Sequence, residues 1–199
     1  RVNKEFASAA PVVVSVLSKD PGVLLPLTLY TPNPRIPYDK IGLFLHSKHM
    51  CLDYFVHLNP QWSDKDKRIV FPTLYQTVGR DITDKSPAKW HKYSGACSYI
   101  PAKPAALAGQ NIILTEDLLS ATKAQFFAPD GWLAVAMMGT TLYADLVAQL
   151  LGAKSVTVML DGDDAGISGT AKVMRKLQLV GKVCVRHVLD EGLDPKDQS

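Results

Sequence analysis

Three aspartates follow an apolar run near the C-terminal end of the chain. Residues 155–166 read SVTVMLDGDDAG, so a run typical of a buried strand ends at Asp161, Asp163 and Asp164. Carboxylates gathered at one edge of a sheet repel one another unless a hard cation neutralises them. The simplest such cation is Mg²⁺ or Mn²⁺, and the pattern therefore predicts metal-dependent chemistry at this edge.

A second acidic position follows another short apolar run. Residues 111–115 read NIILT and precede Glu116 and Asp117, which stand just before a helix-like stretch, LLSATKAQFF. In open α/β sheets, ligands bind in the crevice beyond the carboxyl ends of the strands. We therefore expect Glu116 to share one crevice with Asp161 and Asp163.

Strands and helices alternate beyond a region at residues 100–110, IPAKPAALAGQ, whose prolines and small residues break any regular pattern. The patterns predict strands at residues 111–115, 132–138, 155–160 and 182–189, with helices at 118–127, 141–153 and about 167–179 between them. This alternation predicts an α/β fold with a mostly parallel, four-stranded sheet and crossover helices on its faces.

The first half of the chain is expected to form a mixed α+β lobe with irregular loops. It is rich in proline and contains short β-like pieces, GLFLH at residues 42–46, YFVHL at 54–58 and RIVFPTLY at 68–75. No apolar stretch reaches the roughly 18 residues that a membrane-spanning helix needs, and the PVVVSVL run lacks the arrangement of a signal peptide. We therefore expect a cytoplasmic protein without a membrane partner.

Charge is divided unequally along the chain. Residues 1–109 contain 14 Lys+Arg against 8 Asp+Glu, or +6, whereas residues 110–199 contain 8 against 11, or −3. A basic lobe suits a polyanion and an acidic lobe suits metal ions, although ordinary scatter of surface charge is the alternative. We place the domain boundary between residues 105 and 106, with a basic lobe that would bind a polyanion before it and an acidic domain that would bind metal ions after it.

These residues resemble a known family. Glu116, the GTTL turn at residues 139–142 and the DGDDAG segment are similar in order and spacing to the Toprim domain, which bacterial-type primases, topoisomerases, certain nucleases and recombination mediators share. EDLLSA and DGDDAG, preceded by RIVFP, VGRDI and PAKW, resemble more specifically the catalytic core of bacteriophage and bacterial-type DNA primases. The resemblance covers residues 110–197 well and residues 68–93 moderately.

The resemblance implies a Rossmann-like Toprim fold and a nucleotidyltransferase of the primase type. Such an enzyme uses Mg²⁺ or Mn²⁺ to make short RNA primers from ribonucleoside triphosphates on single-stranded DNA. Glu116, Asp161 and Asp163 are implied as catalytic residues, and the same three acids with Asp194 as metal ligands. A helicase or a zinc-binding module, on another segment or chain, is an expected partner, and the host-cell cytoplasm is the expected compartment if the protein is viral.

A further group of residues is expected to contact the substrate or the template. Arg80 and the Lys89-Trp90 pair match positions that follow the RIVFP-like strand and precede the Toprim domain in primases. Arg80, Lys89 and Lys92 would face phosphates, while Trp90 would stack on a base.

The sequence departs from the primase pattern at two places. Primases often have an aspartate four residues beyond the first glutamate, where this chain has Ser120. They commonly have two acids separated by proline near the C-terminal end of the domain, whereas here Asp194-Pro195 is followed by Lys196, with Asp197 one place later.

Other interpretations of the same residues stay open. A metal-dependent Toprim nuclease would use similar acids to cut rather than join, and a DNA-binding recombination mediator would keep the fold without the reaction. DGDDAG could also be only the start of a helix, since aspartate is favoured at such positions. A cap needs one acid rather than three, and the basic lobe favours the primase over the nuclease.

Overall fold

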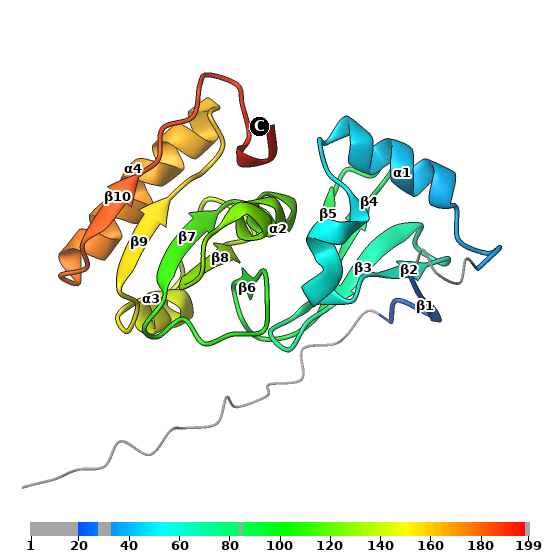
Figure 1. Cartoon of the computed structure of the whole chain (residues 1–199), viewed down its shortest axis with the longest axis horizontal. Helices are drawn as coiled ribbons and strands as arrows, with labels where there is room; N and C mark the ends of the chain where they lie inside the picture. Colours follow the sequence, from blue (N-terminus) through cyan, green and yellow to red (C-terminus); the bar gives the residue numbers. More distant parts are fainter. Residues whose placement is uncertain (1–19, 28–32, 84, 198–199) are drawn as a thin grey trace, which may run out of the picture.

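The computed structural model describes residues 20–27, 33–83 and 85–197, which form two sheets lying side by side (Figure 1). The first sheet has the order β1-β2-β3-β4-β5, and all its neighbouring strands are antiparallel. Its strands are β1 (Leu24–Pro26), β2 (Gln61–Ser63), β3 (Arg68–Pro72), β4 (Thr77–Asp81) and β5 (Trp90–Ser94).

The second sheet has the order β10-β9-β7-β8-β6. Its strands are β6 (Ile100–Pro101), β7 (Asn111–Thr115), β8 (Trp132–Ala136), β9 (Ser155–Val158) and β10 (Cys184–Arg186). Four of them are parallel, whereas β6 pairs antiparallel with β8. The α/β fold and the four parallel strands are thus confirmed, and the additional strand β6 is too short to leave a pattern in the sequence.

Helices connect the parallel strands as the sequence predicts. They are α2 (Leu118–Phe127), α3 (Ala144–Leu150) and α4 (Asp164–Leu179). Side-chain caps explain where two of them begin: Asp117 accepts a hydrogen bond from the Ser120 amide at 2.8 Å, and Asp163 accepts one from the Gly166 amide at 2.8 Å. The second cap makes α4 start three residues earlier than expected.

Helix α2 lies at the junction between the two sheets (Figure 1). Its buried side chains, including Leu118 and Leu119, belong to one hydrophobic core with Phe55 and Phe71 of the first lobe. A second core lies between α3, α4 and the other face of the second sheet, and it contains Val156. The first core therefore ties the two sheets together around α2, which restricts their relative movement.

Two expected β-like pieces of the first lobe are helical, so those predictions are wrong. Residues 42–46 lie in α1 (Tyr38–Ser47), and residues 54–58 lie in the 3₁₀ helix η1 (Leu52–Leu58). In α1 the buried residues are Ile41, Phe44 and Leu45, whose spacing of three and four is helical, and a five-residue window was too short to reveal it. RIVFP does form a strand, β3, as predicted.

Some sequence-based expectations are not tested by the structure. The PVVVSVL run lies outside the described residues. The division between residues 105 and 106 stays a prediction; strand β6, which precedes it, pairs with the second sheet. None of the helices in the described part of the chain has the length and apolar character that crossing a bilayer requires.

The loop after β9 is held tightly against the C-terminal turn. The Gly162 amide donates to the Leu193 carbonyl at 2.7 Å, and the Gly192 amide donates to the Gly162 carbonyl at 3.1 Å. A Cβ atom on Gly162 would lie 2.3 Å from the Asp190 carbonyl oxygen, so no side chain fits there. Backbone packing thus brings residues 161–163 beside residues 192–194.

Replacing Gly162 with alanine should therefore destabilise the fold by roughly 1–3 kcal/mol, because the clash is with backbone that cannot turn away. Urea unfolding followed by circular dichroism measures this. Gly42→Ala is the matched control: its Cβ meets open space in α1, so it should be neutral or stabilising by about 0.5–1 kcal/mol. Equal stability of the two variants would contradict the close packing of this loop.

Candidate functional site

Strands β7 and β9 bring two acids to the same edge of the second sheet. The strands are parallel neighbours, with Leu114 opposite Val158, so their carboxyl ends coincide. Glu116 directly follows β7, and its carbonyl accepts a hydrogen bond from the Gly139 amide at 2.9 Å, which ties it to the GTTL turn. Asp161 follows β9 three residues after Val158. Both side chains line one cavity, as the sequence predicts.

The electrostatics of these two acids are unfavourable in the absence of a cation. Burial, together with the nearby charges of Asp163 and Asp117, raises the pKa of Glu116. Burial and the charge of Glu116 raise the pKa of Asp161 to about 7. Asp161 Oδ1 is also buried without a hydrogen-bond partner in the part of the chain that the structure describes. A buried, unpartnered carboxylate oxygen beside a second carboxylate is a donor set suited to a hard divalent cation.

Asp163 lies outside this cavity in the structure. Its side chain is exposed and caps α4, although its charge still acts on both Glu116 and Asp161. The cap interpretation of DGDDAG therefore applies to Asp163 and not to Asp161. Ser120, at the position where primases often have an acid, is fully buried and does not line the cavity.

The C-terminal turn contributes an acid and a buried cation. Asp194 lines the cavity, and its Oδ2 atom forms an ion pair with Nζ of Lys196, which also lines it. Lys196 lies in the short 3₁₀ helix η2 (Pro195–Asp197) and is only 7% exposed. Sequence reasoning noted this lysine only as a departure from a motif and did not assign it to the site.

The opposite wall of the cavity is basic and aromatic and comes from the first lobe. Arg80 on β4 stands opposite Trp90 on β5 in the sheet register, and Lys89 precedes Trp90. The Arg80 guanidinium lies 5.3 Å from the centre of the Phe44 ring and 5.8 Å from the centre of the Trp90 ring, a cation–π arrangement that fixes its direction. Three of the four predicted contact residues, Arg80, Lys89 and Trp90, thus line the cavity together.

A buried arginine that sequence reasoning missed holds Lys89 in position. The Arg68 guanidinium donates hydrogen bonds to the carbonyls of Lys89 at 3.1 Å and Ala88 at 2.9 Å, and to Ser86 Oγ at 2.8 Å. The only signal in the sequence was a charged residue at the start of the apolar RIVFP strand. The network fixes the loop that leads into β5, so the exposed Lys89 side chain starts from a fixed backbone.

Lys92 lies apart from this group. Its ammonium donates to the Cys97 carbonyl at 3.1 Å, and it does not line the cavity. Lys48, the residue that directly follows α1, does line the cavity and was not anticipated. Lys48 follows the helix that the sequence analysis took for a strand, so no pattern placed it near the acids.

These walls enclose a cavity of about 230 Å³ between the two lobes. It is lined by Lys48, Arg80, Lys89, Trp90, Glu116, Asp117, Met138, Gly139, Asp161, Asp194 and Lys196. Three basic residues of the first lobe, Lys48, Arg80 and Lys89, therefore face four acids across this space, and Lys196 lies among those acids. In the described part of the chain, no group of three or more Asp, Glu, His or Cys side chains is arranged to hold a metal ion. Asp163 and Asp194, two of the expected ligands, have other partners.

Comparisons with known proteins identify the second lobe. Residues 115–199 match the family model described as Toprim-like. A search of curated proteins finds no significant sequence match.

Solved structures of primases have the same fold. The RNA polymerase domain of Mycobacterium tuberculosis primase DnaG is 14% identical, with a TM-score of 0.62 over 83% of this chain and 72% of that chain. A DnaG primase catalytic domain bound to ssDNA is 13% identical, with a TM-score of 0.62 over 82% and 67%.

A third similar structure is longer. The zinc-binding and RNA polymerase domains of Aquifex aeolicus primase are 22% identical, with a TM-score of 0.51. The match covers 65% of this chain and only 36% of the Aquifex chain. Residues 115–199 are therefore a Toprim-like domain, and the resemblance to the Toprim-containing catalytic core of bacteriophage and bacterial-type DNA primases is confirmed at the level of the fold.

Proposed function

We propose that this chain is the catalytic core of a DNA primase, which joins ribonucleotides into short RNA primers on single-stranded DNA. The observation that supports this best is the cavity itself, where Glu116 and Asp161 of the Toprim-like domain face Arg80, Lys89 and Trp90 of the other lobe. A reaction between two nucleotides needs a site for charge neutralisation and a site for phosphates, and the two walls supply one each.

Glu116 and Asp161 would hold a divalent cation, Mg²⁺ or Mn²⁺. When bound, such an ion neutralises charge on the phosphate that is transferred. A Glu116 carboxylate oxygen that does not hold the ion could accept a proton from the attacking 3′ hydroxyl, because this side chain lines the same cavity. Asp163 is a candidate for a supporting role through its charge.

The basic wall would orient the negatively charged substrate. Lys89 and Lys48 provide ammonium groups for phosphates, while Arg80 is directed by the aromatic rings that it contacts. Trp90 is partly exposed, so part of its ring is accessible for stacking with a base. The similar DnaG domain bound to ssDNA supports a single-stranded template.

The proposal is tested by template-dependent synthesis with single-stranded DNA, four labelled ribonucleotides and Mg²⁺ or Mn²⁺. Wild-type protein should make short oligoribonucleotides, and Asp161→Ala should lower the rate at least about a hundredfold, because transition-state charge is no longer neutralised. Asp130→Ala, which alters an exposed acid of the same domain outside the cavity, should retain activity.

The same assay with an added RNA primer detects elongation, even if the protein needs another module to initiate synthesis. Metal-dependent degradation of labelled DNA, lost in Asp161→Ala, would replace the primase with a nuclease. Absence of both synthesis and elongation would count against a catalytic core.

Burial of Asp161 and repulsion by Glu116 predict that Asp161→Asn stabilises the metal-free protein at pH 8, by on the order of 2 kcal/mol after solvent screening of a partly exposed side chain. The pKa of Asp161 is raised from 3.8 to about 7 in the folded protein. Ionisation of Asp161 therefore begins to destabilise the fold above pH 4, and the destabilisation is complete above pH 7. The gain should therefore shrink as the pH falls from 7 to 4. Thermal melting in EDTA at several pH values measures it, and a loss of stability at pH 8 would contradict the repulsion.

Lys89→Ala should weaken binding of single-stranded DNA or ribonucleoside triphosphate about three- to tenfold, because one phosphate contact is lost. For DNA, the slope of log K against log salt should fall by about 0.7. Fluorescence anisotropy over a salt series measures both. Lys172→Ala, which removes an exposed lysine of α4 outside the cavity, is the control. Unchanged affinity of Lys89→Ala for both ligands would exclude Lys89 from the binding wall.

A further inference from the structure

Lys196 places a buried positive charge directly among the acids of the cavity. Its side chain lines the cavity beside Glu116, Asp161 and Asp194, and only 7% of the residue is exposed. Its Nζ atom pairs with Asp194 Oδ2. Lysine is seldom buried without a partner, so the position of this ammonium is coupled to the carboxylates around it.

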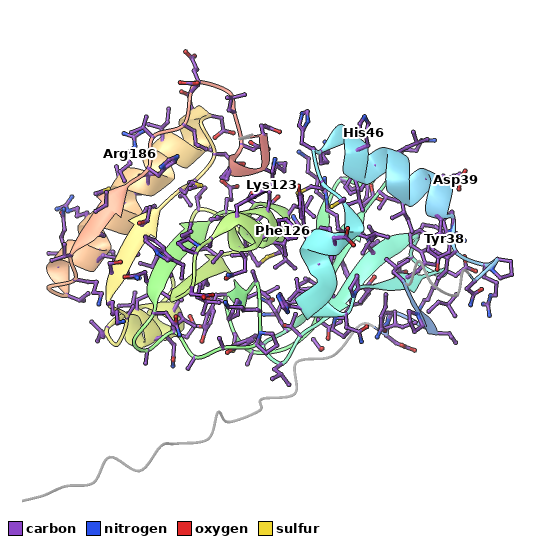
Figure 2. All side chains as sticks on the ribbon, in the orientation of Figure 1. Tyr38, Asp39, His46, Lys123, Phe126 and Arg186 are labelled. Carbon is purple, nitrogen blue, oxygen red and sulfur yellow. The ribbon has the colours of Figure 1, made fainter. Side chains whose placement is uncertain are left out.

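The backbone around Lys196 is held by several hydrogen bonds. Lys123 on α2 points toward the C-terminal turn η2, and its Nζ donates to the Lys196 carbonyl at 2.6 Å (Figure 2). The Asp194 amide donates to Asp197 Oδ2 at 2.9 Å, and the Asp197 amide donates to the Asp194 carbonyl at 2.9 Å. The turn is thus built to present Lys196 to the cavity.

The Lys196 charge acts on Glu116 and Asp161, which have no ion-pair partner among the described residues. Burial is the main cause that raises the pKa of Glu116 and of Asp161, and the charge of Lys196 opposes it at both. Among the described cavity residues, this lysine therefore neutralises part of the charge that a divalent cation would neutralise.

We propose that the Lys196 ammonium is a built-in counterion that takes one cation position of the cluster, so that the cavity binds a single divalent ion at Glu116 and Asp161. This inference deepens the proposed function, because it concerns the metal content of the same cavity. Asp194 is then a partner of Lys196 and not a metal ligand.

The cost of the opposite arrangement supports this assignment. A divalent ion on Asp194 would leave the buried Lys196 charge without its partner and beside two further positive charges, a combination that burial makes unfavourable. Ser120 and Asp163 do not compensate, because Ser120 is buried away from the cavity and Asp163 caps α4.

The test counts bound metal. Mn²⁺ titrations of the metal-free chain, followed by electron paramagnetic resonance of free Mn²⁺ and by calorimetry, should give one site in the wild type. Lys196→Met should bind Mn²⁺ at least about tenfold more tightly or acquire a second site, because the repulsion of a divalent ion by a neighbouring ammonium is removed. Lys196→Arg, which retains the charge, should stay near the wild-type stoichiometry.

Two further variants separate charge from structure. Lys172→Met removes an exposed lysine outside the cavity and should leave Mn²⁺ binding unchanged. Asp161→Asn should abolish the single site. Melting temperatures with and without Mn²⁺ establish that each variant is folded, and Lys196→Gln replaces Lys196→Met if the latter unfolds.

The counterion proposal would be overturned by two Mn²⁺ sites in the wild type or by the absence of a site in every protein tested. Identical Mn²⁺ binding by the wild type and the folded neutral variant of Lys196 would overturn it as well. One Mn²⁺ site in the wild type and tighter or additional Mn²⁺ binding in the neutral variant would support it. That result stands even if the protein makes no RNA, so the metal count and the synthesis assay can fail separately.

Discussion

Burial of Glu116 and Asp161 at one sheet edge, with the charge repulsion that accompanies it, is the constraint around which the cavity is organised. Two neighbouring parallel strands end at the same sheet edge, so acids that follow both strands must lie near each other. Burial then raises the pKa of both carboxyl groups and leaves Asp161 Oδ1 without a partner among the described residues. Such an arrangement destabilises a fold unless positive charge lies nearby. The surrounding elements either carry that positive charge or hold the residues that carry it in place.

Those sources come from both lobes and depend on the core that joins them. The core around α2 includes Phe55 and Phe71 of the first lobe, so the sheet with Arg80 and Trp90 is held at a fixed place relative to the acids. Within that sheet, the Arg68 guanidinium donates hydrogen bonds to backbone carbonyls, and these bonds fix the segment before β5. Positioning by buried residues explains how an exposed side chain such as Lys89 can belong to a defined site.

The second lobe was largely predictable because its signals are local. Apolar runs with acids at their ends identified β7 and β9, and capping by Asp117 agrees with the helix expected at residues 118–127. The first lobe was not predictable to the same degree, since five-residue windows cannot separate a strand from the buried side of α1. Lys48 and Lys196 line the cavity, and Arg68 supports Lys89, through tertiary contacts between distant segments that no periodicity in the sequence reveals. The sequence likewise does not reveal that the Asp163 side chain caps α4 instead of lining the cavity, because the position of the folded backbone decides this.

A lysine and a divalent ion neutralise the same carboxylates but differ in chemistry. The ammonium is always present at its position and does not depend on metal concentration, yet it cannot act as a Lewis acid toward a hydroxyl group. A cavity in which Lys196 takes one cation position therefore has less capacity to activate a nucleophile through metal, and more of the proton transfer must fall to a side chain. Glu116 is placed for that task, because the GTTL turn fixes its backbone at the cavity edge and its side chain lines the cavity. The counterion and the base are in this sense two consequences of one arrangement of charges.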